Sequence, residues 1–129
     1  MKLTRFYQNE QHVSVFSDIE IALPDTRTDA GWTFSLSRVI GSTAALLVEL
    51  PVGLDQDWHP APNRQLVVVL AGRLQVEVAG GHQREWGAGE MFFADDTGGQ
   101  GHLTRVIQGP AHLLFVCLPD DFDVATLTA

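Results

Sequence analysis

The chain carries short apolar segments separated by turn residues, and this pattern predicts an all-β protein. Between Val13 and Leu118 the segments are rich in Val, Leu, Phe and Trp and are bounded by Gly, Pro or Asp, which is typical of strands rather than helices. The tail, residues 122–128, is weakly patterned and predicts a short helix or a loose end. Strands are predicted at residues 13–16, 19–23, 32–40, 43–50, 66–70, 73–79, 82–86, 91–94, 103–108 and 111–118.

Glycine-containing turns join several of these strands into predicted hairpins. Glycine supplies the positive φ that a tight turn needs. The turns are predicted at residues 40–43, 71–73, 79–82 and 109–110. Pairing between strands that follow one another in the chain is therefore expected, as in a meander.

Two neighbouring strands differ in their patterning, and the difference predicts a partner. Residues 74–78 alternate apolar and polar side chains, as a strand with one buried face should. Residues 66–70 are apolar throughout, which fits a strand buried on both faces and covered outside by another strand or subunit. We therefore expect a homodimer.

Composition narrows the class of protein. The 129 residues suffice for one domain, and the net charge of −8 with only eight Lys and Arg argues against nucleic acid as a partner. The N-terminus shows neither a signal peptide nor a membrane span, so a cytoplasmic location without membrane association is expected. The lone Cys117 lies in an apolar run and is expected to be a buried thiol.

The candidate chemistry centres on two histidines at strand or loop ends. His59 precedes the strand that begins near residue 66, and His102 closes the Gly-rich loop at residues 95–101. Loop and strand ends are where functional groups collect on β-barrels. His12, His82 and His112 stand in less suggestive contexts, and we expect none of them to be a ligand.

The spacing around His59 resembles the first motif of the cupin superfamily. That motif runs Gly, five residues, His, one residue, His, three residues, Glu, six residues, Gly. The corresponding residues here are Gly53, His59, Ala61, Gln65 and Gly72, so every spacing is kept.

The second cupin motif resembles the stretch from Trp86-Gly87-Ala88-Gly89-Glu90 to His102, with a loop about two residues longer than usual. The resemblance covers roughly residues 50–118 and extends to a subgroup of short, one-domain cupins. It implies an antiparallel jelly-roll barrel, also called a double-stranded β-helix, that occupies residues 1–129 as a single domain.

Departures from the cupin motif weaken the metal site that the family implies. Ala61 replaces the second histidine and Gln65 replaces the glutamate, so His59 and His102 would meet a divalent Fe, Mn, Ni or Zn ion with one neutral amide. Without an anionic ligand the affinity should be low. One replacement is open: if residues 57–61 are extended, Asp57 shares a face with His59 and could complete a two-His, one-carboxylate site.

Several side chains near these histidines have alternative interpretations. His59 and His102 can equally be polar residues that hydrogen-bond to Gln65 or to the backbone in a pocket without metal. Asp95 and Asp96 could form an acid/base pair, but a solvated loop is the favoured interpretation. Trp58, Ala61 and Phe92 are expected to form the wall of the pocket.

Two functions remain open on the sequence. The favoured one is a small-molecule-binding cupin whose apolar cavity carries His59, Gln65 and His102 at its polar end. The alternative is a metal-dependent enzyme of the dioxygenase, isomerase or decarboxylase kind, with His59 and His102 as ligands. Whether the protein is a catalyst, and of which substrate, stays open because one fold hosts many chemistries.

Overall fold

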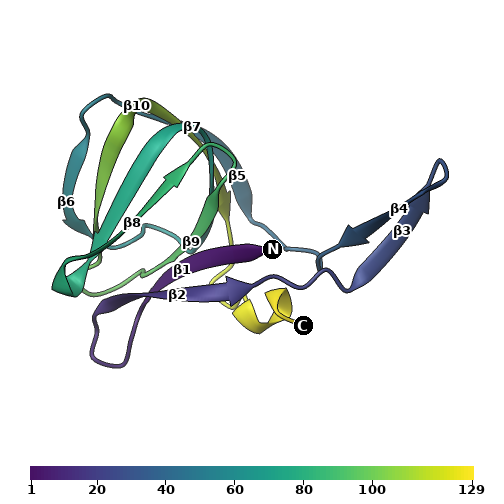
Figure 1. Cartoon of the computed structure of the whole chain (residues 1–129). Helices are drawn as coiled ribbons and strands as arrows, with labels where there is room; N and C mark the ends of the chain where they lie inside the picture. Colours follow the sequence, from purple (N-terminus) through teal and green to yellow (C-terminus); the bar gives the residue numbers. More distant parts are fainter.

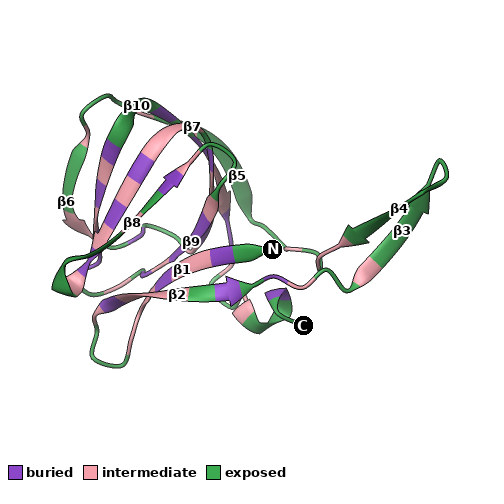
Figure 2. Cartoon of the chain, in the orientation of Figure 1, coloured by how far each residue is buried: buried purple, intermediate pink, exposed green.

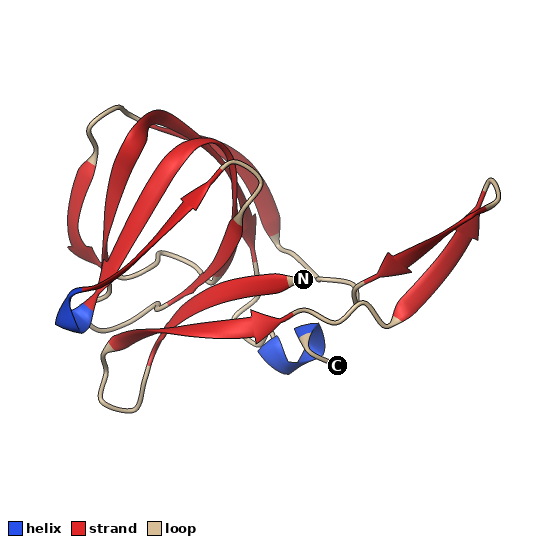
Figure 3. Cartoon of the chain, viewed as in Figure 1, coloured by secondary structure: helices blue, strands red, loops and turns tan.

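The computed structural model describes residues 1–129 and confirms the all-β prediction, because its regular structure is ten strands and two short 3-10 segments (Figures 1 and 3). In chain order these are β1 (Lys2–Gln8), β2 (Ser14–Glu20), β3 (Asp25–Asp29), β4 (Trp32–Leu36), β5 (Ala44–Leu50), β6 (Asp55–His59), β7 (Gln65–Val78), η1 (Ala79–Gly81), β8 (His82–Gly87), β9 (Met91–Asp95), β10 (His102–Cys117) and η2 (Val124–Leu127).

Eight strands form one sheet that curls around an apolar interior (Figure 1). Its order is β2-β1-β9-β7-β10-β5, with β6 also paired to β10 and β8 also paired to β7. All pairs are antiparallel except β1 with β9, which run parallel from Thr4 opposite Phe92 to Tyr7 opposite Asp95. The predicted antiparallel jelly-roll barrel is therefore correct apart from this one pair.

Two predicted hairpin turns are wrong, because β7 and β10 run unbroken through residues 71–73 and 109–110. The register of the pair instead shifts between Val106 and His112, so β10 bulges opposite Gly72. Gly72 has a φ of +81°, and a Cβ on it would lie 2.6 Å from the carbonyl oxygen of Gln108. Glycine is required here because the bulged backbone of β10 comes close to β7, rather than for a chain reversal.

The other two predicted turns have different outcomes. The turn at residues 79–82 is confirmed, since η1 joins β7 to β8 with Val78 opposite His82. The hairpin at residues 40–43 is wrong, because β4 ends at Leu36 and β5 pairs with β10. The segments β1, β3 and β6 were not predicted as strands, since their polar sequences lack an apolar run.

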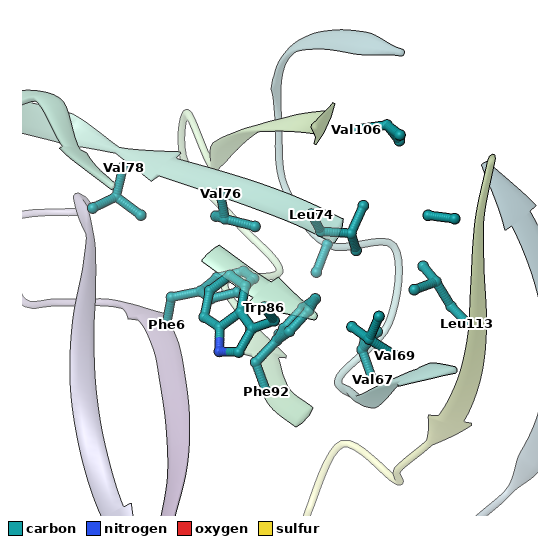
Figure 4. Packing of buried hydrophobic residues seen from close by; sticks show 13 residues of the cluster. Phe6, Val67, Val69, Leu74, Val76, Val78, Trp86, Phe92, Val106 and Leu113 are labelled. Atoms are coloured by element: carbon teal, nitrogen blue, oxygen red, sulfur yellow. The ribbon is translucent and has the colours of Figure 1, made fainter. Parts of the chain in front are cut away.

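The buried apolar residues form two clusters, and the larger one lies inside the barrel, around its cavity (Figure 4). Phe6, Trp86 and Phe92 stack together there beside aliphatic residues of β7. Figure 2 shows the alternation of buried and less buried positions along β7. The smaller cluster includes Phe93 and Leu127. Leu127 belongs to η2, so the short helix predicted in the tail packs against this cluster.

The strand predicted to be buried on both faces has only one fully buried face. Val67 and Val69 point inward and are buried, whereas Leu66 and Val68 are half-buried and Leu70 is 49% exposed. Cys117 is buried and free, as expected. The chain has no helix with the length and apolar character that a membrane crossing requires.

Strands β3 and β4 form a separate hairpin that projects away from the barrel (Figures 1 and 2). We call residues 25–36 the arm. The two strands pair only with each other, and most arm residues are exposed.

Candidate functional site

The barrel encloses a cavity of about 220 Å³ with apolar walls and one polar end. Eleven of the seventeen residues that line it are hydrophobic, and they include Phe6, Val67 and Phe92. The lining also includes five polar residues: Gln56, His59, Gln65, His102 and Thr104. We call the three that the sequence singled out, His59, Gln65 and His102, the polar end. An apolar cavity with a few convergent polar groups is the usual form of a small-molecule site.

His59 and His102 face each other because the last residue of β6 pairs with the first residue of β10. Their ring centroids are 4.5 Å apart. Gly101 precedes His102 with a φ of +79°, and a Cβ there would overlap the backbone of His59 and Pro60. The backbone at Gly101 thus lies very close to that of His59, and this close approach brings the two imidazoles together.

Hydrogen bonds fix the protonated nitrogen of each ring. His59 Nδ1 lies 2.6 Å from the carbonyl oxygen of Asp57, which can only accept, so this nitrogen is a donor. His102 Nδ1 lies 2.7 Å from Asp96 Oδ2 and likewise donates to the carboxylate. In the neutral rings Nε2 then keeps its lone pair. The polar end thus offers two imidazole acceptors side by side.

Asp96 is the functional residue that the sequence reasoning missed. The favoured interpretation was a solvated loop, yet Asp96 is 0% exposed and accepts from Ser14 Oγ at 2.8 Å as well as from His102. Its Oδ1 has no hydrogen-bond partner, which is uncommon for a buried carboxylate. Its position directly after a buried strand was the one available signal.

Asp95 is also no part of a solvated loop. Its carboxylate is 4% exposed and accepts hydrogen bonds from Arg5 Nη2 and Arg64 Nε, each at 2.6 Å. Arg64 also donates to the carbonyl oxygens of Asp120 and Phe122. Asp95 therefore links β1, the start of β7 and the tail, and it is absent from the cavity lining.

Asp57 does not join the histidines, because a β-bulge interrupts β6. Gln56 pairs with Thr104 and His59 with His102, so three steps along β6 match two along β10. Alternation is lost, and Gln56 rather than Asp57 lines the cavity. Asp57 is exposed, and its carboxylate accepts from the backbone N–H of Trp58.

Of the remaining predicted pocket residues, two line the cavity and one does not. Ala61 and Phe92 are 3% and 5% exposed and line the cavity. Trp58 is half-buried but is not among the lining residues. The bulge that turns Asp57 outward lies beside Trp58, so both residues leave the wall for one reason.

The donors at the polar end do not fit a complete cupin metal site. Nowhere in the chain do three or more His, Cys, Asp or Glu side chains come close enough to hold an ion. The nearby carboxylate of Asp96 accepts a hydrogen bond from His102 Nδ1. Asp96 would therefore support a metal ligand rather than be one itself. The only ligand-type side chains that the structure brings into contact here are the two imidazoles of His59 and His102.

Comparisons with known proteins find structural matches alone. No family model matches the chain, and no curated protein matches it. Among solved structures, the cupin domain of Schizosaccharomyces pombe Cnp3 matches with a TM-score of 0.45 and 21% identity, over 88% of this chain and 80% of that chain. The barrel architecture described above rests on the chain's own curled sheet, and the match adds nothing about ligand or activity.

Proposed function

We propose that the chain is a small-molecule-binding cupin whose ligand lies in the barrel cavity. The observation that carries this proposal is the pair of imidazoles, each fixed through Nδ1, at the end of an otherwise apolar cavity. The apolar body of the ligand contacts Phe6 and Phe92, and its polar group reaches His59 and His102.

The size and chemistry of the cavity define the ligand class. A cavity of about 220 Å³ is smaller than the roughly 300–1,000 Å³ typical of drug-sized ligands. Because neutral Nε2 atoms only accept, the ligand supplies a hydroxyl or N–H donor. The Gln65 amide can both donate and accept beside it. A small, mostly apolar alcohol, phenol or amine has this combination.

Asp96 acts as a positioning residue in this proposal. Its carboxylate holds His102 Nδ1–H and is itself held by Ser14, so the imidazole has one orientation before a ligand arrives. A fixed acceptor loses less freedom on binding than a mobile one. Asp96 thus contributes to affinity without contacting the ligand.

The test compares p-cresol with toluene, two probes of similar shape of which only p-cresol carries a donor. Affinities are measured by NMR titration on the wild type and on His59→Ala, His102→Ala and His112→Ala. One hydrogen bond contributes about 1 kcal/mol, so the wild type should favour p-cresol by about fivefold. The preference should fall in each cavity variant, because one of the two acceptors is lost, and persist in full in His112→Ala, an exposed histidine on the outer surface.

Three outcomes contradict the proposal. They are the absence of binding by either probe at millimolar concentration, equal affinity of the wild type for both, and a preference that is unchanged in both cavity variants. His59 is the safer of the two substitutions, because its Nδ1 partner is a backbone carbonyl and no buried carboxylate is left behind.

A metal-dependent enzyme is the second candidate, and the free Nε2 atoms of His59 and His102 favour it. Histidine ligands to metals commonly bind through one nitrogen while a carboxylate or carbonyl holds the other. Asp96 and the carbonyl of Asp57 supply that support here. Fe, Mn, Ni or Zn would supply Lewis-acid or redox chemistry at this position.

Calorimetric titration with Zn²⁺ and with Fe²⁺ separates the two candidates. With no anionic ligand at the polar end, we expect binding weaker than micromolar. It should be lost in His59→Ala and His102→Ala but retained in His112→Ala. A tightly held, stoichiometric metal in the wild type would favour the metal-dependent enzyme over the small-molecule-binding protein. Metal affinity that survives both cavity substitutions would show that His59 and His102 are not the metal ligands.

A further inference from the structure

The barrel cavity carries a second pair of polar side chains next to the two histidines. Gln56 on β6 lies opposite Thr104 on β10, just as His59 lies opposite His102, and both Gln56 and Thr104 line the cavity. We call Gln56 and Thr104 the second polar pair. Thr104 follows His102 by two residues on one strand, so both side chains point inward and their Cα atoms are about 6.6 Å apart. One substituted six-membered ring can bridge this separation.

Thr104 is buried among apolar side chains, yet its hydroxyl has no hydrogen-bond partner within the chain. The residue is 9% exposed, and its inward-pointing neighbours are Val76 across the sheet and Val106 further along β10. Asp96 Oδ1 is the one fully enclosed side-chain polar atom that lacks a hydrogen bond, so the free Thr104 hydroxyl is open to the cavity. Valine has nearly the same shape and would avoid the cost of a polar group in apolar surroundings. The partner of this hydroxyl therefore has to come from the contents of the cavity.

The β-bulge in β6 brings a neutral amide rather than a carboxylate to the cavity. It turns Gln56 inward, while Asp57 stays exposed and accepts from the backbone N–H of Trp58. None of the seventeen lining residues is Asp, Glu, Lys or Arg. A buried charge without a partner costs far more than a neutral polar group, so the lining favours an uncharged ligand.

We propose that Gln56 and Thr104 form a second polar contact for the ligand of the barrel cavity. This inference rests on the proposed function and narrows its ligand class to uncharged molecules with two polar groups about one six-membered ring apart. A hydroxyl donor at one end of the ligand reaches the imidazoles. A second hydroxyl reaches the second polar pair, whose side chains can both donate and accept. A phenol with a hydroxymethyl group in the para position has this form.

The test compares 4-hydroxybenzyl alcohol with 4-ethylphenol, two probes of closely similar shape that differ by one hydroxyl group. NMR titration gives both affinities on the wild type, Thr104→Val and Gln56→Leu. One hydrogen bond contributes about fivefold in affinity, so the ratio of the two affinities should fall by about fivefold in Thr104→Val. A smaller fall is expected in Gln56→Leu, because Gln56 is exposed and water can replace its amide. A ratio taken within one variant cancels any change that affects both probes alike.

The matched control is Thr28→Val, at an exposed threonine of the arm, which should leave the ratio at its wild-type value. Thr104→Val should also keep or raise the urea midpoint, because it removes a buried hydroxyl that has no partner in the chain. A hydroxyl with a purely structural role would instead lower the midpoint on substitution and leave the ratio unchanged.

A third probe, 4-hydroxybenzoate, tests whether the ligand is uncharged. Its carboxylate replaces the hydroxymethyl group and is ionised at pH 7. It should bind the wild type at least about tenfold more weakly than 4-hydroxybenzyl alcohol, since no cationic Lys or Arg lines the cavity. Intermolecular NOEs give the position of the alcohol, whose methylene protons should contact the methyl group of Thr104.

Failure of this inference can be told apart from failure of the proposed function. If the wild type does not prefer p-cresol over toluene, both fall together. If that preference is found, three results overturn this inference alone. They are an affinity ratio that is equal in the wild type, Thr104→Val and Gln56→Leu, binding of 4-hydroxybenzoate as tight as that of the alcohol, and the absence of NOEs to Thr104.

Discussion

The barrel and the arm are built from the same kind of hydrogen-bonded antiparallel pairs, yet they differ in what their side chains do. Phe6 in the barrel is 0% exposed and packs against three other rings, whereas Trp32 in the arm is 75% exposed. Backbone pairing alone adds little net stability, because water competes for the same hydrogen bonds. The comparison teaches that the barrel is stabilised by its own interior, while the arm has no buried interior of its own.

The largest expected effect comes from truncating one aromatic side chain in each region. Phe6→Ala should lower the free energy of unfolding by about 3–5 kcal/mol, because it leaves a cavity in a closely packed core. Phe34→Ala should lower it by less than about 1 kcal/mol, since Phe34 is 44% exposed. Urea unfolding measures both, and equal losses would show that the arm is not the independent element described here.

The buried carboxylate of the barrel provides the next test. Asp96→Ala should lower the free energy of unfolding by about 1.5–3 kcal/mol, because charge-assisted hydrogen bonds to Ser14 and His102 are lost. The variant should also lose the downfield NMR signal of His102 Nδ1–H and the preference for p-cresol. Asp29→Ala, an exposed carboxylate of the arm, is the matched control. An unchanged His102 signal in Asp96→Ala would contradict the positioning role.

Two glycines with similar backbone conformation separate strain from crowding. Gly101 and Gly31 have φ of +79° and +83°, but only at Gly101 would a Cβ meet other atoms. Gly31→Ala in the arm should cost about 1–2 kcal/mol from the left-handed conformation alone. Gly101→Ala should cost more, and it should also weaken binding of p-cresol by moving His59 away from His102. Equal losses of unfolding free energy in the two variants would mean that the backbone at Gly101 is not closely packed against that of His59.

The smallest effect concerns acid stability at the surface of the barrel. Hydrogen bonds from Gln83 and then from Arg105 hold the pKa of the Glu77 carboxyl below its ordinary value of 4.5. A lowered pKa in the folded state adds stability that is fully present above about pH 4.5 and is lost as the pH falls through the folded value. Glu77→Gln should therefore flatten the fall of the urea midpoint below pH 4.5.

The control for this titration is Glu10→Gln, at an exposed position in the turn between β1 and β2. Its pH profile should follow that of the wild type. Identical profiles for Glu77→Gln and the wild type would remove Glu77 as a source of acid sensitivity.

Much of the candidate site could be predicted from the sequence. The spacing from Gly53 to Gly72 and the position of His102 indicated one pocket for His59, Gln65 and His102, and all three line the same cavity, with the two histidine rings in contact. These positions follow from local rules, because alternation along a strand fixes which side chains face inward. The same rule failed at Asp57, where a bulge in β6 inserts one residue and turns the carboxylate outward.

The sequence by itself determined the all-β class, the identity of the histidines and the apolar character of the cavity, since composition and period-two alternation are local properties. The tertiary structure alone decided that Gly72 accommodates a bulge of β10 rather than a turn, that Asp96 holds His102, and that the arm stands apart from the barrel. Each of these depends on segments far apart in the chain. Ser14 and Asp96, for example, are 82 residues apart and meet only when the sheet has curled.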